Sequence, residues 1–288
     1  MMVWVLLPAF NEEDSLPRLF LKIDEVFTSC GFKYRIVVVN DGSTDNTRDI
    51  VEAYIGKYPI DIVNHSINRG LGETERDGFE YIVGRCDDED AVIRLDCDDT
   101  HDPKYFLDLL KKINEGYDVV ISSRFRPGGG QIGVDAYRAV ISWGANIFMK
   151  LVFNICGVRD YSCGFRAYRG KTLKYAVKIF GNGFIQLKGL GFTSTLETIV
   201  KLKLLGSTFA EIPFMLRYDR KVGYSKMITS LTTLGYFIMA MLYHWPFGGW
   251  RISYRDLARS FHESPERTVS TFRAHVQKRS LMCRIGGG

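Results

Sequence analysis

The sequence lacks the short motifs that define several common classes of nucleotide and metal site. No Gly-Lys-Ser or Gly-Lys-Thr follows a glycine-rich loop, which excludes the P-loop pattern. Gly70-Leu71-Gly72 lacks the third glycine of a dinucleotide fingerprint, so a Rossmann oxidoreductase is disfavoured. The six cysteines include no CxxC pair, and the five histidines have no metal-ligand spacing. The cysteine usage favours a reduced, cytosolic setting, and the first residues form a strand-like run rather than the charged start of a secretion signal.

An excess of charge of one sign is confined to the end of the chain. The net charge is +5 over 288 residues, and residues 251–288 hold eight Lys or Arg against three Asp or Glu. The first 250 residues are therefore balanced. A basic tail favours anionic surfaces such as lipid, although it is equally compatible with a solvated appendage. Few aromatic residues lie between its basic ones, so we do not expect nucleic acid as a partner.

Strand-like and helix-like apolar patterns alternate through the first half of the chain. We expect strands at 3–7, 36–39, 61–64, 91–95 and 119–122, and helices at 15–29, 47–58, 74–84 and 104–116. Such alternation predicts βαβ units, and therefore an α/β fold with a mostly parallel central sheet flanked by helices. A further apolar helix is expected at 142–156. The basic, glycine-rich stretch at 124–130 is expected to be a mobile segment, either a lid or a plain linker.

A dense group of carboxylates follows the strand expected at 91–95. Four aspartates fall within seven positions: Asp96, Asp98, Asp99 and Asp102. Carboxylates this close repel one another unless a cation or hydrogen-bond donors hold them. The carboxyl ends of strands in an open α/β sheet are ligand sites, and oxygen donors there suit Mg²⁺ or Mn²⁺ shared with a substrate phosphate. An EF-hand loop is excluded, because its sixth and twelfth positions would be His101 and Leu107. A polar loop that only caps the next helix is the alternative.

Two further polar segments, at 8–12 and 40–45, follow the first two expected strands. Parallel strands bring their carboxyl ends to one edge of a sheet. A nucleotide needs an apolar face for its base and acceptors for base N–H groups and ribose hydroxyls. Pro8 and Phe10 with Glu12 and Asp41 supply both. Each segment alone is ordinary turn chemistry, but three at successive strand ends predict a nucleotide site.

Together with later segments, these segments resemble family 2 glycosyltransferases of the GT-A fold. Within that family, they resemble the dolichyl- and polyprenyl-phosphate mannose synthases. The matching segments span about residues 3–245 and are 7–12, 40–45, 68–72, 96–98, 101–103, 123–125, 138–146, 163–166, 211–213 and 220–226. Two of them are the most specific. Gly164-Phe165-Arg166 and the Arg-x-x-Gly-x-Ser-Lys pattern at 220–226 point to polyprenyl-phosphate acceptors within the family.

The resemblance implies inverting, metal-dependent transfer of mannose from GDP-mannose to a polyprenyl (dolichyl) phosphate. It assigns the nucleotide sugar to Pro8, Phe10, Glu12, Asp41, Asp96 and Asp98, and the Mg²⁺ or Mn²⁺ ion to Asp96 and Asp98 with Thr100. It assigns the acceptor phosphate to Arg124, Arg138, Ser142, Arg220 and Lys226, with Asp96, Asp98, Arg124 and Arg220 as the catalytic residues. The loop at 127–130 resembles a mobile acceptor loop. A transferase that uses a UDP-sugar and an inactive nucleotide-sugar-binding protein remain as alternatives.

Residues 227–245 carry no charged side chain, over a length that just reaches across a bilayer. The hydroxyl-rich first half and the basic residues beyond it favour an amphipathic helix in the membrane interface over a spanning one. A buried core helix is the other alternative. We therefore expect peripheral attachment to the cytosolic face of a membrane, the endoplasmic reticulum in a eukaryote or the plasma membrane in a prokaryote. The resemblance to shorter family members also implies a small membrane-anchoring subunit as a partner.

The expected organisation is a catalytic domain at 1–226, an interfacial helix at 227–250 and a basic tail at 251–288. Within the catalytic domain, a nucleotide-sugar half at 1–123 precedes an acceptor half at 124–226.

Overall fold

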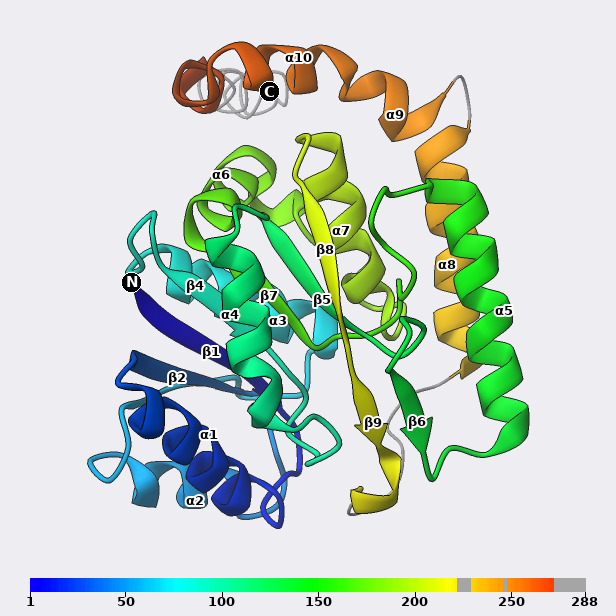
Figure 1. The fold of residues 1–288 in the computed structure, drawn as a ribbon. Coiled ribbons are helices and arrows are strands. Elements are labelled where there is room, and N and C mark those ends of the chain that lie inside the picture. The colour runs from blue at the N-terminus through cyan, green and yellow to red at the C-terminus, as the bar shows by residue number, and fades with distance from the viewer. Residues whose placement is uncertain (222–228, 246–247, 272–288) are drawn as a thin grey trace, which may run out of the picture.

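The computed structural model describes residues 1–221, 229–245 and 248–271 (Figure 1). Seven strands form the central sheet in the order β3-β2-β1-β4-β7-β5-β8. They are β1 Met2–Ala9, β2 Lys33–Asn40, β3 Ile60–Asn64, β4 Ala91–Arg94, β5 Val119–Ser123, β7 Arg166–Arg169 and β8 Phe209–Pro213. All neighbouring pairs are parallel apart from those of β7, which runs antiparallel to β4 and β5. The expected mostly parallel α/β sheet is confirmed, with one reversed strand that the sequence pattern did not predict.

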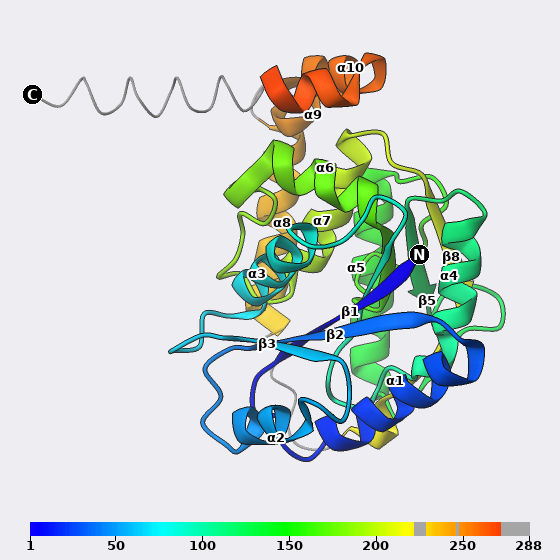
Figure 2. The same cartoon turned by 90° about the vertical axis from the view of Figure 1, so that its left-hand side faces the viewer.

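Helices cover both faces of this sheet, which is why its central strands are continuous apolar runs rather than alternating ones. The helices are α1 Leu16–Cys30, α2 Thr47–Tyr54, α3 Leu71–Val83, α4 Phe106–Asn114, α5 Ala136–Phe153, α6 Gly170–Phe180, α7 Thr193–Leu204, α8 Thr229–His244, α9 Gly249–Ser253 and α10 Arg255–Glu263. α1 and α4 lie on one face, and α3, α6 and α7 lie on the other (Figure 2). α1 buries an apolar stripe that includes Leu19, Phe20 and Ile23, and it ends at Gly31 in the left-handed conformation.

The two expected halves of the catalytic domain share one sheet. β7 and β8 both come from the half at 124–226, yet β7 lies between β4 and β5 of the first half. The acceptor half therefore contributes to the core on which the nucleotide half is built. It does not form a separate unit.

The basic, glycine-rich segment at 124–130, expected to be a mobile lid or a plain linker, contains a turn and the first residue of a strand, and its mobility stays a prediction. Its last residue opens β6 (Gly130–Ile132), which pairs in parallel with β9 (Met215–Arg217) in a small second sheet. The backbone N–H of Gly129 donates to the carbonyl of Arg126 at 2.8 Å, and that of Gly130 donates to Phe214 at 3.0 Å. A turn and a strand therefore give this segment a defined path beside the sheet.

α5 and α8 lie side by side along one flank of the molecule (Figure 1). α8 buries Tyr236 and Met239 against the body but exposes Leu234 and Phe237. This two-sided pattern differs from that of a buried core helix. In the part of the chain that the structure describes, no helix combines the length and the apolar character needed to cross a membrane.

α9 and α10 lie across the end of the molecule away from β6 and β9 (Figure 1). The Tyr254 ring packs edge-on against Phe180 of α6, with ring centroids 5.4 Å apart, and Phe261 packs in the same way on Tyr175. The segment expected to be a basic tail from residue 251 therefore begins as helices that pack on the body.

Candidate functional site

A cavity of about 870 Å³ opens at the carboxyl ends of β1, β2, β4 and β5. Ten of the residues singled out from the sequence line it: Pro8, Phe10, Glu12, Asp41, Asp96, Asp98, Thr100, Arg124, Arg138 and Ser142. Arg220 does not belong to the lining, and Lys226 lies outside the described residues. The volume is in the range of sites that enclose a cofactor or a small-molecule substrate.

The acidic edge of the cavity is a tight turn that directly follows β4. Asp98 accepts hydrogen bonds from the hydroxyl and the backbone N–H of Thr100, at 2.6 and 3.3 Å. Its other carboxylate oxygen, Oδ2, contacts the ammonium of Lys221, which comes from the chain just beyond β9. Burial opposes the charge on Lys221, but Asp98 and Asp96 together raise the pKa of its ammonium. The turn also holds Asp99 in the left-handed region, with φ 61°, a conformation that is costly for this residue and common at functional sites.

A buried arginine fixes the first aspartate of this turn. Arg94, at the end of β4, lies between Asp96 and Glu75, with nitrogen–oxygen distances of 2.6 Å to each carboxylate. Burial opposes the charge on Asp96, but Arg94, with a smaller contribution from Lys221, holds the pKa of its carboxyl below the ordinary value. Gly164 makes room for this arrangement, because a Cβ at that position would overlap the Arg94 guanidinium.

His101 supports the same turn as a neutral side chain. Burial lowers the pKa of its imidazole, and its Nδ1 accepts a hydrogen bond from the backbone N–H of Asp96 at 3.0 Å. Its ring stacks on Phe165, with centroids 5.2 Å apart. Arg166, next to Phe165, donates to the carbonyls of Thr195 and Tyr161. The segment 164–166 was one of the most specific parts of the family resemblance. In the structure, Gly164 packs on Arg94 and Phe165 stacks on His101, so this segment contacts the residues that position the acidic turn.

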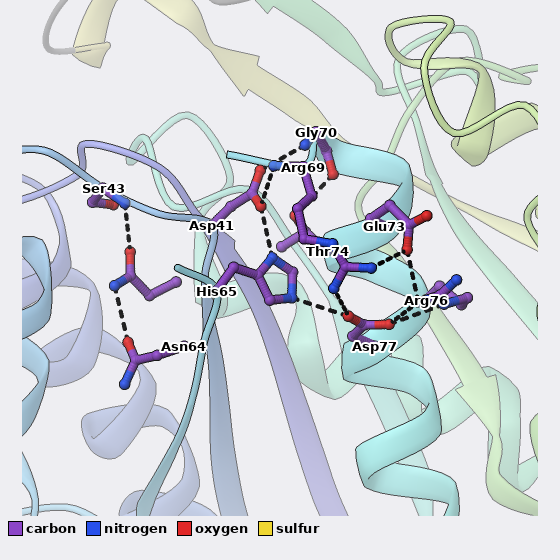
Figure 3. A network of polar contacts seen from close by, with 11 residues as sticks. Asp41, Ser43, Asn64, His65, Arg69, Gly70, Glu73, Thr74, Arg76 and Asp77 are labelled. Carbon is purple, nitrogen blue, oxygen red and sulfur yellow. Dashed lines mark hydrogen bonds and ion pairs between the residues drawn. The ribbon is translucent and has the colours of Figure 1, made fainter. Parts of the chain in front are cut away.

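The wall expected to hold the nucleotide is made by the segments after β1 and β2. The two segments are joined where the backbone N–H of Asn11 donates to Ser43 at 3.0 Å and that of Thr44 donates to the Asn11 side chain at 2.8 Å. Asp41 was expected to bind the nucleotide, and it lines the cavity. In the structure, its carboxylate accepts bonds from the backbone N–H groups of Arg69 and Gly70, both at 2.9 Å, and contacts His65 (Figure 3). Asp41 thus shapes the wall through residues 69–70.

The basic wall is centred on Arg124, whose side chain is 12% exposed. Its Nε and Nη2 both donate to the carboxylate of Asp160 at 2.8 Å, and Nη2 also reaches the Ser162 hydroxyl at 2.7 Å. Burial opposes the charge of Asp160, but Arg124 holds the pKa of the carboxyl below the ordinary value. Glu211 holds the backbone of Asp160 in place, since its carboxylate accepts a hydrogen bond from the Asp160 N–H at 2.8 Å. Nη1 of Arg124 takes no part in these bonds.

The other predicted phosphate ligands are less closely grouped. Arg138, near the start of α5, lines the cavity and donates to the Tyr218 hydroxyl at 3.0 Å. Ser142 lies one turn further along the same helix and also lines it. Arg220 instead points to Asp102, with 3.4 Å between nitrogen and oxygen. The structure therefore brings Arg124, Arg138 and Ser142 together and leaves Arg220 at the margin.

Three basic lining residues were missed by the sequence reasoning: Arg69, Lys188 and Lys221. Arg69 and Lys221 lie within segments that were recognised, so their charge was a usable signal. Lys188 lies in no recognised segment. It reaches the cavity because the chain before α7 folds over α3, where its ammonium pairs with Glu73 at 2.9 Å. Its position follows from tertiary packing.

The donor set at the acidic edge fits a divalent cation that shares its coordination with a substrate. Among the residues that the structure describes, no three His, Cys, Asp or Glu side chains converge as a metal site. Mg²⁺ in particular is often held by only one or two carboxylates together with substrate phosphates. Asp98 already binds one cationic group, the Lys221 ammonium. The carboxylates of Asp98 and Asp96 are thus suitable ligands, with Thr100 beside them.

The open sheet, with an acidic turn after β4 and basic residues lining the same cavity, defines a GT-A-type architecture. The chain belongs to glycosyl transferase family 2, since the model of that family matches residues 4–175. The expectation of family and fold class is therefore confirmed.

Two curated relatives are similar over most of this chain. The dolichol-phosphate mannosyltransferase of Pyrococcus furiosus is 30% identical over 215 residues, which cover 74% of this chain but only 56% of that protein. The undecaprenyl-phosphate mannosyltransferase of Micrococcus luteus is 28% identical over 228 residues, 79% of this chain and 88% of that one.

Solved structures share the fold at lower identity. Glucosyl-3-phosphoglycerate synthase from Mycobacterium tuberculosis, in complex with Mn²⁺, UDP and phosphoglyceric acid, superposes with a TM-score of 0.56 at 18% identity. The match covers 84% of this chain and 77% of that one. This neighbour agrees with the GT-A-type fold of the central sheet.

Proposed function

We propose that this protein transfers mannose from GDP-mannose to the phosphate of a polyprenyl lipid such as dolichyl phosphate. The observation that supports this best is the shared cavity, whose lining includes the carboxylates Asp96 and Asp98 as well as the arginines Arg124 and Arg138. A diphosphate-linked donor suits the acidic side once a cation is present, and a phosphate acceptor suits the arginines. The names of the relatives from Pyrococcus furiosus and Micrococcus luteus agree with a polyprenyl-phosphate acceptor.

On the donor side, Asp98 and Asp96 would hold Mg²⁺ or Mn²⁺, with Thr100 orienting the Asp98 carboxylate through its 2.6 Å bond. When bound, the ion supplies Lewis-acid stabilisation of the diphosphate leaving group. Pro8 and Phe10 offer an apolar face to the base. Arg69 and Lys188 add positive charge to the same wall, which favours a nucleoside diphosphate.

On the acceptor side, Arg124 and Arg138 orient a phosphate monoester toward the anomeric carbon, with Ser142 beside them. The second pKa of a phosphate monoester is about 6, so its dianion is already a nucleophile at neutral pH. A phosphate oxygen forms the new bond to the anomeric carbon while the bond to the nucleoside diphosphate breaks on the opposite face, which inverts the configuration. No protein base is required for this step.

A lipid acceptor implies contact with a membrane surface, and α5 and α8 offer a suitable face. Beside the cavity, these helices expose large apolar side chains: Tyr137, Val140, Trp143, Ile147, Leu151, Leu234, Phe237 and Met241, with Trp245 just beyond α8. An exposed apolar patch flanked by basic residues is typical of helices that lie in the headgroup region. We propose peripheral attachment through this face, which extends the interfacial helix expected at 227–250 to include α5.

The proposal is tested with the full-length protein, a short polyprenyl phosphate, Mn²⁺ or Mg²⁺ and a panel of labelled GDP- and UDP-sugars. Formation of a lipid-linked, acid-labile mannose from GDP-mannose alone is the expected result. Product from a UDP-sugar instead would change the donor but keep the acceptor. Nucleotide binding without any lipid-linked product would contradict transferase activity and favour an inactive binding protein.

A further inference from the structure

His65 is a buried histidine next to the nucleotide wall, outside every motif recognised in the sequence. It directly follows β3, and its side chain is only 4% exposed. Its Nδ1 lies 2.7 Å from Asp41 Oδ1, and its Nε2 lies 3.0 Å from Asp77 Oδ2 on α3 (Figure 3). The imidazole thus joins the end of one strand to a helix on the face of the sheet.

Both ring nitrogens of His65 face carboxylate oxygens, which accept hydrogen bonds and cannot donate them when ionised. A neutral imidazole has one N–H and one lone pair, so one contact would set a lone pair against a carboxylate. An imidazolium has two N–H groups and satisfies both contacts. Asp41 also accepts two backbone N–H groups. Burial opposes the charge on Asp77, but the neighbouring cations, above all Arg76, hold the pKa of its carboxyl below the ordinary value.

The two carboxylates share the segment that forms the nucleotide wall. Asp41 binds the backbone N–H groups of Arg69 and Gly70, while Asp77 binds the Arg69 side chain through Nη1 at 2.8 Å. The backbone and side chain of Arg69 are therefore both anchored to groups that His65 connects. Residues 68–71 line the cavity.

We infer that His65, as an imidazolium, is a positioning residue that clamps residues 68–71 in the shape that receives a nucleoside diphosphate. The inference rests on the proposed donor site and deepens it. It makes donor affinity dependent on the charge of a side chain that lies behind the wall and touches no substrate.

Other charged groups lie around this histidine, and they determine the net charge of its surroundings. α3 presents Glu73, Arg76 and Asp77, the cavity wall presents Arg69, and Lys188 pairs with Glu73 from the segment before α7. With Glu80, which lies 3.9 Å from Arg76, the carboxylates Asp41, Asp77 and Glu73 outnumber the cations Arg69, Arg76 and Lys188 by one. The imidazolium supplies a positive charge between Asp41 and Asp77.

The test is the dissociation constant of GDP and, in parallel, of UDP, each with Mn²⁺, measured by calorimetry on the full chain at neutral pH. In His65→Gln the two-sided charged contact is lost, and we expect binding near neutral pH to weaken about tenfold, as loss of a charge-assisted hydrogen bond implies. His262→Gln is the matched control, because His262 is exposed on α10 away from the cavity, and it should follow the wild type.

Two further measurements keep the test independent of how well His65→Gln folds. Asp77→Asn keeps an acceptor for Arg69 but removes one of the two charged partners of the imidazole, so the affinity for both nucleotides should fall toward that of His65→Gln. Nitrogen-15 spectra of the wild-type imidazole at neutral pH should show protons on both ring nitrogens. A single ring proton, or equal affinities of wild type and His65→Gln, would overturn the inference and leave the proposed function intact. Absence of nucleotide binding by the wild type would overturn both.

Discussion

Asp160→Asn tests how the basic wall is held in place. The Asp160 side chain is fully buried and accepts the Arg124 backbone N–H at 3.1 Å, its Nε and Nη2 at 2.8 Å, and the Cys163 N–H at 3.0 Å. Asparagine keeps one oxygen but turns an N–H₂ group toward donors, and it leaves the guanidinium without its counter-charge. Removing one partner of a buried ion pair costs about 3–5 kcal/mol in the free energy of unfolding.

A loss of this size is measurable as a change in Tm. Each 1 kcal/mol shifts Tm by about 2–4 °C in chains of roughly 150–250 residues, so we expect a decrease on the order of 10 °C. The pH dependence has a defined sign. The folded-state pKa of Asp160 is lowered by Arg124 against burial, so the stabilisation is present above the ordinary carboxyl pKa and is lost as pH falls through the folded-state value. The difference between wild type and variant should therefore be full at neutral pH and shrink in acid.

The same substitution should raise the KM for polyprenyl phosphate, because Arg124 loses its fixed orientation, and should leave the KM for the nucleotide sugar nearly unchanged. Asp118→Asn is the matched control. Asp118 also accepts hydrogen bonds, from Thr172 at 2.7 Å and from Thr208 at 2.8 Å, but it lies outside the cavity lining. It should cost less stability and leave both KM values unchanged. A wild-type Tm together with an unchanged acceptor KM in Asp160→Asn would refute this reasoning.

Three further predictions follow from other contacts. Gly164→Ala should displace the Arg94 guanidinium and lower kcat at least tenfold, measured by transfer of labelled sugar, while a wild-type rate would contradict the packing described here. Lys221→Met should bind Mn²⁺ about fivefold more tightly in the absence of nucleotide, since an ion pair of ~1 kcal/mol no longer competes; calorimetry measures this. Leu151→Ser, at a side chain that is 79% exposed, should weaken binding to anionic vesicles in flotation assays, whereas Leu107→Ser on α4 should not.

Local patterns predicted most of the first half of the fold. The strands expected at 36–39, 61–64 and 91–95 match β2, β3 and β4 closely, because buried parallel strands are continuous apolar runs. β7 was not predicted. It is only four residues long, it begins and ends with arginine, and its place between β4 and β5 depends on pairing with strands far away in the sequence.

The candidate site, like the fold, was predicted from the sequence only in part. The acidic turn after β4 was visible as four aspartates in seven positions, and the structure places Asp96 and Asp98 at the cavity. The partners that hold these residues were not visible, because Arg94 reads as part of an apolar strand and Asp160 and His65 belong to no recognised pattern. Their roles depend on buried ion pairs and hydrogen bonds between distant segments.

The central claim is that one cavity holds the donor diphosphate on its acidic side and the acceptor phosphate on its basic side. The most direct test is the initial rate of mannosyl transfer over a matrix of GDP-mannose and polyprenyl-phosphate concentrations, for wild type, Asp98→Asn and Arg138→Gln. We predict that Asp98→Asn lowers kcat at least a hundredfold with little change in the acceptor KM, and that Arg138→Gln raises the acceptor KM about tenfold with the donor KM unchanged. Equal effects of both variants on both substrates, or full activity of Asp98→Asn, would contradict the account.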